Sequence, residues 1–377
     1  MKIALFTDSF LPSVGGTEQA VLRFATELSK EHQVMVFAPR AGKNFDDSAF
    51  PFKVVRAKSI RVTKNDYWAM PWLSGELKKQ LNKFQPDVVH TQTVGMMAGF
   101  GNKYAKKHNV PVVCTVHTKF RYCYKDALKN SLLAEILLNT VMKRVKKSDR
   151  VCAVSQSMAN ELKSYRVKNP ITVIRNGNDL QRVVTNKDVK TGKFKIIFVG
   201  RIIDYKNLGF SLEVLGELKK TYNDFEFYLV GQGPHVNKFK KLSEKLGIKD
   251  NVIFTGVITD KAKLKELYAQ SDLFFFTSLF DSDGLVVMEA ASEGTPSLVL
   301  NESGVAERMV DNQTGFIVGN DKTAIVKRLK ELIEDRELLR NVGLNSYKIF
   351  SSWKETVEKY LVVYKEEIGK KLKNKKQ

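Results

Sequence analysis

Two carboxylates, Asp281 and Glu289, stand eight positions apart on either side of Gly284 and an apolar run that predicts the start of a helix. This spacing places Asp281 beside the helix N-terminus and Glu289 about two turns along, on nearly the same face. A glycine lets a ligand approach the backbone, and the free N–H groups of a helix start favour an anion. The combination suits a phosphate joined to a polyhydroxylated group, as in a sugar nucleotide.

Two basic residues follow a strand-like run over 193–200, namely Arg201 and Lys206. The guanidinium fork can bind planar oxygens and the ammonium acts as a mobile point charge, so the pair can converge on a diphosphate. A solvated surface pair is the alternative interpretation. We favour the diphosphate because ligands of parallel α/β sheets bind beyond the carboxyl ends of strands.

A glycine pair and two histidines mark further strand ends in the first half of the chain. Gly15 and Gly16 precede a helical pattern, and they indicate either close backbone approach to a phosphate or an ordinary strand-to-helix turn. His90 and His117 each end an apolar run and precede a threonine, which predicts a ligand-facing role for His117 and leaves a core role open for His90. No histidine, cysteine or aspartate set has metal-ligand spacing, and we interpret the resemblance of 281–283 to an Asp-x-Asp metal motif as coincidental.

Short apolar runs alternate with amphipathic stretches, which predicts α/β domains with largely parallel sheets. The expected domains are residues 1–177 and 193–351, with 178–192 as linker and a C-terminal helix over 352–377 that packs back on the first domain. Strands are expected at 2–7, 33–38, 52–56, 87–90, 111–116, 149–154, 171–175, 193–200, 225–230, 252–255, 272–276 and 296–300. The clearest helical patterns of the first half cover 17–30, 95–108 and 124–147.

The composition limits the class of protein and its partners. No apolar run approaches the roughly 18 residues that span a bilayer, no signal peptide is evident, and three cysteines without ligand spacing indicate reduced thiols in a cytoplasmic protein. The net charge is +21, and residues 51–150 alone hold 20 basic and 6 acidic residues. Such a one-sided field implies an anionic partner, which is a nucleic acid, an acidic membrane or an anionic substrate.

Taken together, Gly15-Gly16-Thr17-Glu18, Asn176-Gly177-Asn178-Asp179, Arg201 with Lys206 and the Asp281–Glu289 pair resemble, in order, the family 4 retaining glycosyltransferases. The resemblance covers essentially the whole chain and implies the GT-B fold, with two doubly wound Rossmann-like domains facing a central cleft. It implies that the C-terminal domain binds a nucleotide-sugar donor and the N-terminal domain an acceptor. The implied donor residues are Gly16, Arg201, Lys206, Asp281, Gly284, Leu285 and Glu289, and the implied catalytic residues are His117, Asp281, Arg201 and Lys206.

By the same resemblance, Arg201 and Lys206 neutralise the diphosphate and Glu289 binds the ribose. Asp281 faces the transferred sugar, and His117 lies near its reacting end. We expect no cofactor beyond the co-substrate, UDP-glucose by resemblance, and no metal, because protein groups supply the positive potential. The family pattern has glutamate at position 281 and often phenylalanine at 283, where this chain has aspartates. The shorter acid bears on the identity of the sugar more than on the class of reaction.

Basic residues interleave with aromatic and aliphatic ones over 51–83 and 119–147, as in proteins that rest on anionic lipid. The arrangement resembles bacterial diacylglycerol glucosyltransferases, which implies a lipid acceptor and peripheral association with the inner face of the cell membrane. The acceptor and membrane residues expected from it are Trp68, Trp72, Lys119, Arg121, Lys143 and Arg144. A core helix with a solvated basic face is the alternative.

Other functions remain open at this point. A different acceptor of the cell envelope, such as a lipid-linked polysaccharide or a teichoic acid precursor, would use the same donor chemistry. A sugar-nucleotide epimerase or a phosphorylase could share the two-domain plan, and a non-catalytic lipid-binding module would leave the acidic and basic pairs unexplained. A nucleic-acid-binding protein would explain the charge but not the paired acids at a helix start, and no nucleic-acid motif occurs.

Overall fold

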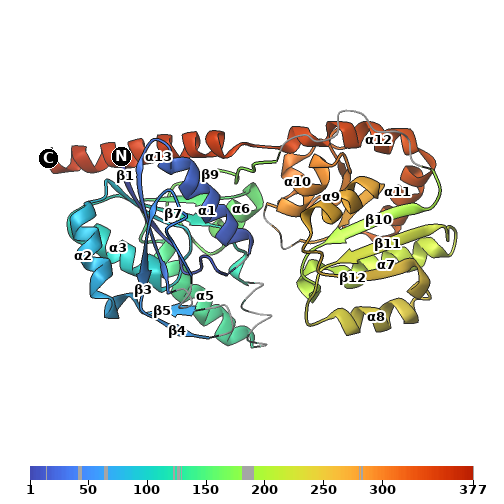
Figure 1. The fold of residues 1–377 in the computed structure, drawn as a ribbon, viewed down its shortest axis with the longest axis horizontal. Helices are drawn as coiled ribbons and strands as arrows, with labels where there is room; N and C mark the ends of the chain where they lie inside the picture. The colour runs from blue at the N-terminus through green and yellow to red at the C-terminus, as the bar shows by residue number, and fades with distance from the viewer. Residues whose placement is uncertain are drawn as a thin grey trace. The chain divides into compact units, whose positions relative to one another are not determined.

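The computed structural model describes residues 1–13, 15–40, 45–62, 67–121, 124, 128, 130–180, 191–279, 281 and 283–376. The chain forms two compact units, Met1–Gly177 with Ser351–Gln377 and Asn178–Phe350. Most of the segment expected as a linker, 181–190, lies outside the described residues. Figure 1 shows that each unit is a sheet flanked by helices.

The first unit is built on a seven-stranded parallel sheet in the order β3-β2-β1-β6-β7-β8-β9. Its strands are β1 (Lys2–Phe6), β2 (Gln33–Pro39), β3 (Lys53–Ala57), β6 (Val88–Thr91), β7 (Val112–Val116), β8 (Arg150–Ala153) and β9 (Ile171–Val173). Its helices are α1 (Gly16–Ser29), α2 (Gly75–Phe84), α3 (Met96–His108), α5 (Ser131–Val145), α6 (Gln156–Ser164) and α13 (Trp353–Lys376). An antiparallel hairpin of β4 (Ser59–Arg61) and β5 (Tyr67–Ala69) and a short η1 helix (Pro71–Leu73) come between β3 and α2.

The second unit repeats the plan with a six-stranded parallel sheet in the order β12-β11-β10-β13-β14-β15. Its strands are β10 (Phe194–Val199), β11 (Phe225–Val230), β12 (Val252–Gly256), β13 (Leu273–Phe276), β14 (Ser297–Leu300) and β15 (Phe316–Val318). Its α-helices are α7 (Leu208–Lys219), α8 (Val236–Lys245), α9 (Lys261–Gln270), α10 (Leu285–Ser292), α11 (Lys322–Glu334) and α12 (Arg336–Asn345). Its 3-10 turns are η2 (Asp204–Lys206), η3 (Lys249–Asn251), η4 (Ala306–Arg308) and η5 (Ser346–Ile349).

Helices cover both faces of each sheet, so the central strands are apolar throughout rather than alternating. In β13, all four residues are buried, and three of them are phenylalanine. In each sheet the strand order reverses beside one interior strand, which is β1 in the first unit and β10 in the second, and ligands of such sheets bind at the carboxyl ends of the strands near this reversal. The predicted α/β class with two doubly wound sheets is therefore confirmed.

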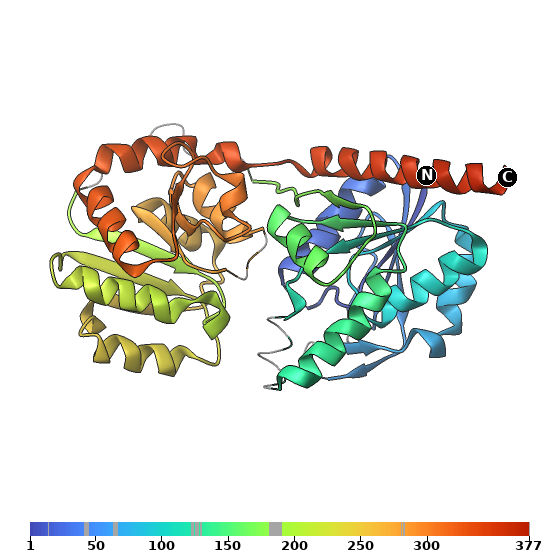
Figure 2. The ribbon, with the colours of Figure 1, turned by 180° about the vertical axis from the view of Figure 1, so that it is seen from behind.

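The C-terminal helix α13 packs on the first unit, alongside α1 (Figures 1 and 2). Trp353, Tyr360 and Tyr364 of α13 share a buried apolar cluster with Phe24 of α1. The Cβ that any other residue would carry at Gly177 would lie 2.5 Å from the backbone of Trp353, so a glycine is required where the two chain segments pass. The helix thus contributes to the core of the first unit.

Candidate active site

In the second unit, Lys206 and Asp281 form an ion pair. The Lys206 ammonium lies 2.6 and 2.7 Å from the two carboxylate oxygens of Asp281, and both side chains are mostly buried. Lys206 ends the η2 turn after β10, and Asp281 follows β13, the neighbouring strand. Because both strands run in the same direction, their carboxyl ends meet at one edge of the sheet. The pair brings together two predicted site residues that are 75 positions apart.

Arg201 belongs to the same strand end but is exposed. Among the residues that the structure describes, its guanidinium has no ion-pair partner. Its loop rests on a turn at Gly231 and Gly233, where a Cβ would lie 1.9 Å from the Gly200 oxygen and 2.2 Å from the Ile202 oxygen. The Ile202 N–H also donates to the Gln232 carbonyl at 3.0 Å. The turn at 231–233 therefore positions the Arg201 loop.

Helix α10 begins at Leu285, after Gly284 in the left-handed conformation with φ of 63°. A Cβ at Gly284 would lie 2.5 Å from a methyl group of Val305, so backbone conformation and packing both require glycine. The helix starts later than the sequence spacing assumed, which places Glu289 about one turn into the helix rather than two. Asp281 precedes the helix, and its position is set by Lys206 instead.

Glu289 lies on α10 with its carboxylate half-buried. Burial raises the pKa of Glu289, while a hydrogen bond from the Tyr268 hydroxyl at 3.2 Å acts in the opposite direction. Tyr268 is itself 1% exposed, so it holds the carboxylate from a rigid position. A carboxylate held in this way can accept hydrogen bonds from a diol.

Asp283 is buried and forms an ion pair with Arg308. The Arg308 Nε lies 3.0 Å from the Asp283 Oδ1, and a terminal nitrogen contacts the same oxygen. The two carboxylates of the 281–283 tripeptide therefore have different cationic partners. Among the described residues, no group of three or more histidine, cysteine, aspartate or glutamate side chains could hold a metal ion.

In the first unit, the two histidines differ in environment. His90 is fully buried at the end of β6, and its ring nitrogens contact the Tyr364 hydroxyl at 2.5 Å and the Thr115 hydroxyl at 2.7 Å. His117 follows β7 and is half-buried, with Nε2 at 2.8 Å from Oε1 of Gln92. Burial lowers the pKa of His90 to about 3 and that of His117 to about 4. Both rings are therefore neutral near pH 7, and His90 is a core residue.

The glycine turn after β1 opens helix α1 as expected. Gly16 is the first helical residue, and a Cβ there would meet nothing within 4 Å, so the backbone is accessible. The preceding Gly15 would direct a Cβ against the carboxylate of Glu18, which accepts a hydrogen bond from the Ser9 hydroxyl. The loop after β1 is thus tied to the first turn of α1.

The residues expected to meet acceptor or membrane fall into two groups. Trp68 and Trp72 are 66% and 59% exposed, and Lys143 is exposed on α5. Lys119, in contrast, is buried, so it is not a surface cation.

Two arginines of that set have structural partners. Arg121 forms an ion pair with Glu135 at 2.9 Å and lies over the ring of Tyr165. Arg144 donates to the Val94 carbonyl at 3.2 Å and packs beside α3. These contacts show that charge counting along the sequence overestimated the free basic surface.

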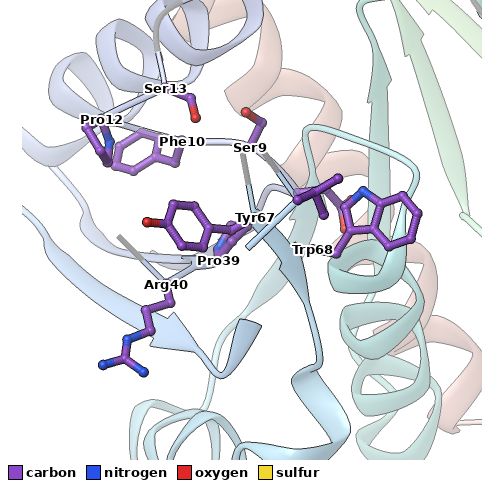
Figure 3. Close-up of a pocket in the computed structure, with 10 residues that line it drawn as sticks. Ser9, Phe10, Pro12, Ser13, Pro39, Arg40, Tyr67 and Trp68 are labelled. Atoms are coloured by element: carbon purple, nitrogen blue, oxygen red, sulfur yellow. The ribbon is translucent and has the colours of Figure 1, made fainter. Parts of the chain in front are cut away.

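A cavity of 320 Å³ lies in the first unit at the carboxyl ends of β1 and β2. Figure 3 shows Tyr67 of the β4–β5 hairpin facing Phe10 of the loop after β1, with the Ser9 and Ser13 hydroxyls above them. The remaining lining residues are Asp8, Pro12, Pro39, Arg40, Val62 and Trp68. The lining combines apolar side chains with several polar and charged ones, so the cavity can hold a small molecule that has both apolar and hydrogen-bonding parts.

Comparison with known families accounts for both units. Residues 14–182 match the family described as Glycosyltransferase Family 4, and residues 181–349 match the family described as Glycosyl transferases group 1. The chain belongs to the family 4 glycosyltransferases. The two matches overlap at residues 181–182 and together cover residues 14–349 of this glycosyltransferase.

Named relatives resemble this glycosyltransferase over most of its length. Alpha-monoglucosyldiacylglycerol synthase of Streptococcus pneumoniae is 27% identical over 320 residues, which are 78% of this chain and 70% of that protein. The Acholeplasma laidlawii protein of the same name is 24% identical over 373 residues, 92% of each chain. HepE of Anabaena, crystallised with UDP, superposes with a TM-score of 0.74 at 17% identity, covering 97% of this chain and 100% of that one, and confirms the GT-B fold.

Two features of the glycosyltransferase site were missed by sequence reasoning. The Lys206–Asp281 pair joins a residue that the sequence assigned to the diphosphate and one that it assigned to the sugar. No local sequence pattern predicts a contact between the ends of two strands. Gln92, which contacts His117, was also missed. Its signal was weak but present, because it follows the His90-Thr91 strand end by one residue.

Proposed function

We propose that this glycosyltransferase moves glucose from UDP-glucose to a membrane lipid such as diacylglycerol, with retention at the anomeric carbon. The observation that carries the proposal is the mostly buried Lys206–Asp281 pair beside the exposed Arg201. The two relatives named for glucosyldiacylglycerol synthesis support the sugar and the acceptor, and the UDP of the HepE crystal supports the nucleotide.

The basic pair serves departure of the diphosphate. As the bond from the anomeric carbon to the diphosphate oxygen breaks, negative charge grows on the leaving group, and preorganised cations stabilise it. An ammonium has three N–H donors, and Lys206 directs two of them to the two carboxylate oxygens of Asp281. Asp281 thus holds the ammonium in place while a donor remains for phosphate. Arg201 supplies the second cation from its glycine-supported loop.

The remaining donor contacts come from α10 and its start. Glu289, held by Tyr268, accepts from the ribose hydroxyls, and the backbone at Gly284 and Leu285 approaches the donor. We assign Asp281 a contact with the transferred sugar, and we assign His117 a role at the reacting end of the substrate. The acceptor hydroxyl attacks the face from which the diphosphate leaves, and its proton passes to the departing phosphate oxygen.

This scheme requires no metal. Arg201, Lys206 and the amides at the start of α10 supply positive potential where a metal supplies it in other transferases. Asp283, the second acid of the Asp-x-Asp tripeptide, is already paired with Arg308, which disfavours that tripeptide as a metal ligand. Full activity in EDTA is the corresponding expectation.

The 320 Å³ cavity is the proposed acceptor site. The apolar part of its lining accepts the start of a lipid chain, and the Ser9 and Ser13 side chains can orient a glycerol hydroxyl (Figure 3). Val62 and Trp68, both exposed, line it and continue into the exposed Ile60 and Met70 of the hairpin region. An acyl chain can leave along this apolar edge.

A membrane surface is the proposed location, at the inner face of the cell membrane. No helix among the described residues is long and apolar enough to cross a bilayer. Instead, α5 exposes a stripe of large apolar side chains, and Figures 1 and 2 both show α5 beside the β4–β5 hairpin. The stripe consists of Leu132, Leu133, Ile136 and Leu137, with exposed fractions of 39–70%. Lys143, Lys146 and Lys147, all exposed, follow near the end of the helix and suit anionic lipid headgroups.

A transfer assay tests the activity directly. We expect glucose to move from UDP-glucose to diacylglycerol in anionic vesicles, and we expect EDTA to leave the rate unchanged. The panel includes GDP-glucose and other UDP-sugars, with and without lipid. Donor hydrolysis without lipid transfer would direct the search to polysaccharide or teichoic acid precursors, and absence of donor turnover with salt-sensitive nucleic-acid binding would overturn the proposal.

A paired substitution tests the membrane surface. Leu132→Asp with Ile136→Asp should weaken binding to anionic vesicles at least about tenfold, because two exposed side chains that would enter the lipid lose their apolar burial. Donor hydrolysis in solution should not change. Val257→Asp with Val310→Asp places the same two charges at apolar residues of the second unit that are 56% and 52% exposed, and it is the matched control. Equal vesicle binding by both variants would exclude α5 as the contact surface.

A further inference from the structure

A buried chain of hydrogen bonds joins His117 to the C-terminal helix. Nε2 of His117 lies 2.8 Å from Oε1 of Gln92, and the Gln92 amide nitrogen lies 3.4 Å from each ring nitrogen of His90. His90 in turn contacts Tyr364 of α13. The Thr115 hydroxyl contacts His90 on one side and the Tyr360 hydroxyl, 2.9 Å away, on the other. Residues from β6, β7 and α13 thus form one network within the first unit.

The network decides which nitrogen of His117 carries the proton. Gln92 can face His117 with its oxygen or with its nitrogen, and the surroundings choose between the two orientations. Both ring nitrogens of His90 already have partners at 2.5 and 2.7 Å, and the Gln92 amide is equidistant from them, so it lies against the ring face. The face of a neutral aromatic ring is negative and attracts N–H groups rather than oxygen.

The amide oxygen of Gln92 is therefore directed to His117. An amide oxygen only accepts, so His117 must donate from Nε2. A neutral imidazole carries one proton, which leaves a lone pair at Nδ1. Among the described residues, Nδ1 of His117 has no hydrogen-bond partner. The main chain of Gln92 is fixed as well, because its N–H donates to the Phe6 carbonyl at 2.7 Å.

We propose that Gln92, His90 and Tyr364 are positioning residues that hold His117 as the Nε2–H tautomer, so that its Nδ1 accepts a hydrogen bond from a hydroxyl group of the bound substrate. The inference rests on the proposed function only for the identity of that substrate. It explains why α13, which follows the second unit in sequence, places two tyrosines in the core of the first. A network that served packing alone would not need a glutamine between two histidines.

Nitrogen-15 NMR of histidine-labelled enzyme tests the tautomer without any substrate. The chain has five histidines, so a His117→Asn variant assigns the signal of interest. We expect a protonated Nε2 and an unprotonated Nδ1 at pH 7. A protonated Nδ1 with a lone pair at Nε2 would overturn the proposal. Because no turnover is needed, this result is independent of whether UDP-glucose is the donor.

Variants test whether the hydrogen-bond network positions His117. Gln92→Met should give a mixture of His117 tautomers and lower kcat about five- to tenfold, as for loss of one oriented hydrogen bond, with the donor KM changed less than about twofold. Tyr364→Phe should change the tautomer ratio of His117 and kcat in the same direction, but less strongly. Tyr104→Phe is the matched control, because it removes another buried tyrosyl hydroxyl of the same unit, which donates to the Leu81 carbonyl.

The outcomes separate positioning from packing. A packing role predicts that Tyr364→Phe and Tyr104→Phe lower the melting temperature alike and leave the His117 tautomer as in the unmodified enzyme, which would overturn the proposal. If NMR shows the expected tautomer but the enzyme uses a different sugar donor, the positioning network is supported and only the proposed function is corrected. A weaker Nε2–H signal of His117 in Gln92→Met, but not in Tyr104→Phe, supports the positioning role.

Discussion

Replacing Lys206 with alanine should lower kcat by a factor on the order of 10²–10³, which is the cost of removing one preorganised group from a developing charge. Lys206 is mostly buried, and its ammonium is held by Asp281 at 2.6 and 2.7 Å. Water cannot replace a charge fixed in such a position as well as the protein does. The loss should appear in kcat and in kcat/KM alike, because the contact strengthens as the diphosphate departs. Steady-state kinetics with UDP-glucose measures it.

Lys238→Ala is the control for that experiment. Lys238 also pairs with an aspartate at 2.8 Å, Asp204, on the same loop region, but its side chain is 59% exposed. Exposed ion pairs contribute little, so turnover should stay within about twofold. Asp281→Asn separates a second effect, because it keeps the side-chain shape and removes the charge that holds Lys206. Turnover of Lys206→Ala within twofold of the unmodified enzyme would remove Lys206 from the catalytic assignment.

The parallel sheets were predictable because burial on both faces produces continuous apolar runs. Every strand expected from the sequence is present, with ends shifted by up to about two residues. Shorter elements left no such pattern. β15 (Phe316–Val318) and the β4–β5 hairpin have three residues per strand, and the hairpin strands carry exposed residues that interrupt the apolar signal. Helix α5 was expected over 124–147 and is described over Ser131–Val145, while much of 122–129 lies outside the described residues.

The site was predictable in its residue types but not in its pairings. Charged residues that follow predicted strands indicated Arg201, Lys206, Asp281 and Glu289 as site residues, because parallel strands have their carboxyl ends at one edge of the sheet. Which cation meets which acid depends on the strand order, in which β10 and β13 are neighbours, and one sequence does not reveal that order. The two residues that depart from the family pattern both form ion pairs. Asp281 reaches Lys206, and Asp283 reaches Arg308.

Removing the Asp283 carboxylate should destabilise the second unit more than any surface change. Asp283 and Arg308 are both buried, and Arg308 also donates to the Ile349 carbonyl at 3.4 Å. Asp283→Ala leaves the guanidinium buried without its counter-charge, which costs about 3–5 kcal/mol of the free energy of unfolding. For a unit of this size, we expect the melting temperature to fall by about 10 °C. Differential scanning calorimetry measures the change.

A double variant distinguishes the lost charge partner from the lost side-chain volume. Asp283→Ala with Arg308→Met removes both charges, so it should recover a large part of the stability, because the buried guanidinium that has lost the Asp283 carboxylate causes most of the loss. Glu337→Ala breaks the exposed pair with Arg340 in the same unit and should change the free energy of unfolding by less than about 1 kcal/mol. Equal melting temperatures of the single and double variants would contradict this account.

Because Asp283 precedes Gly284 and follows Asp281 by two residues, the single variant should also lose transfer activity below its melting temperature. Recovery of stability without recovery of activity would show that the ion pair positions the turn at the start of α10 as well as stabilising the unit.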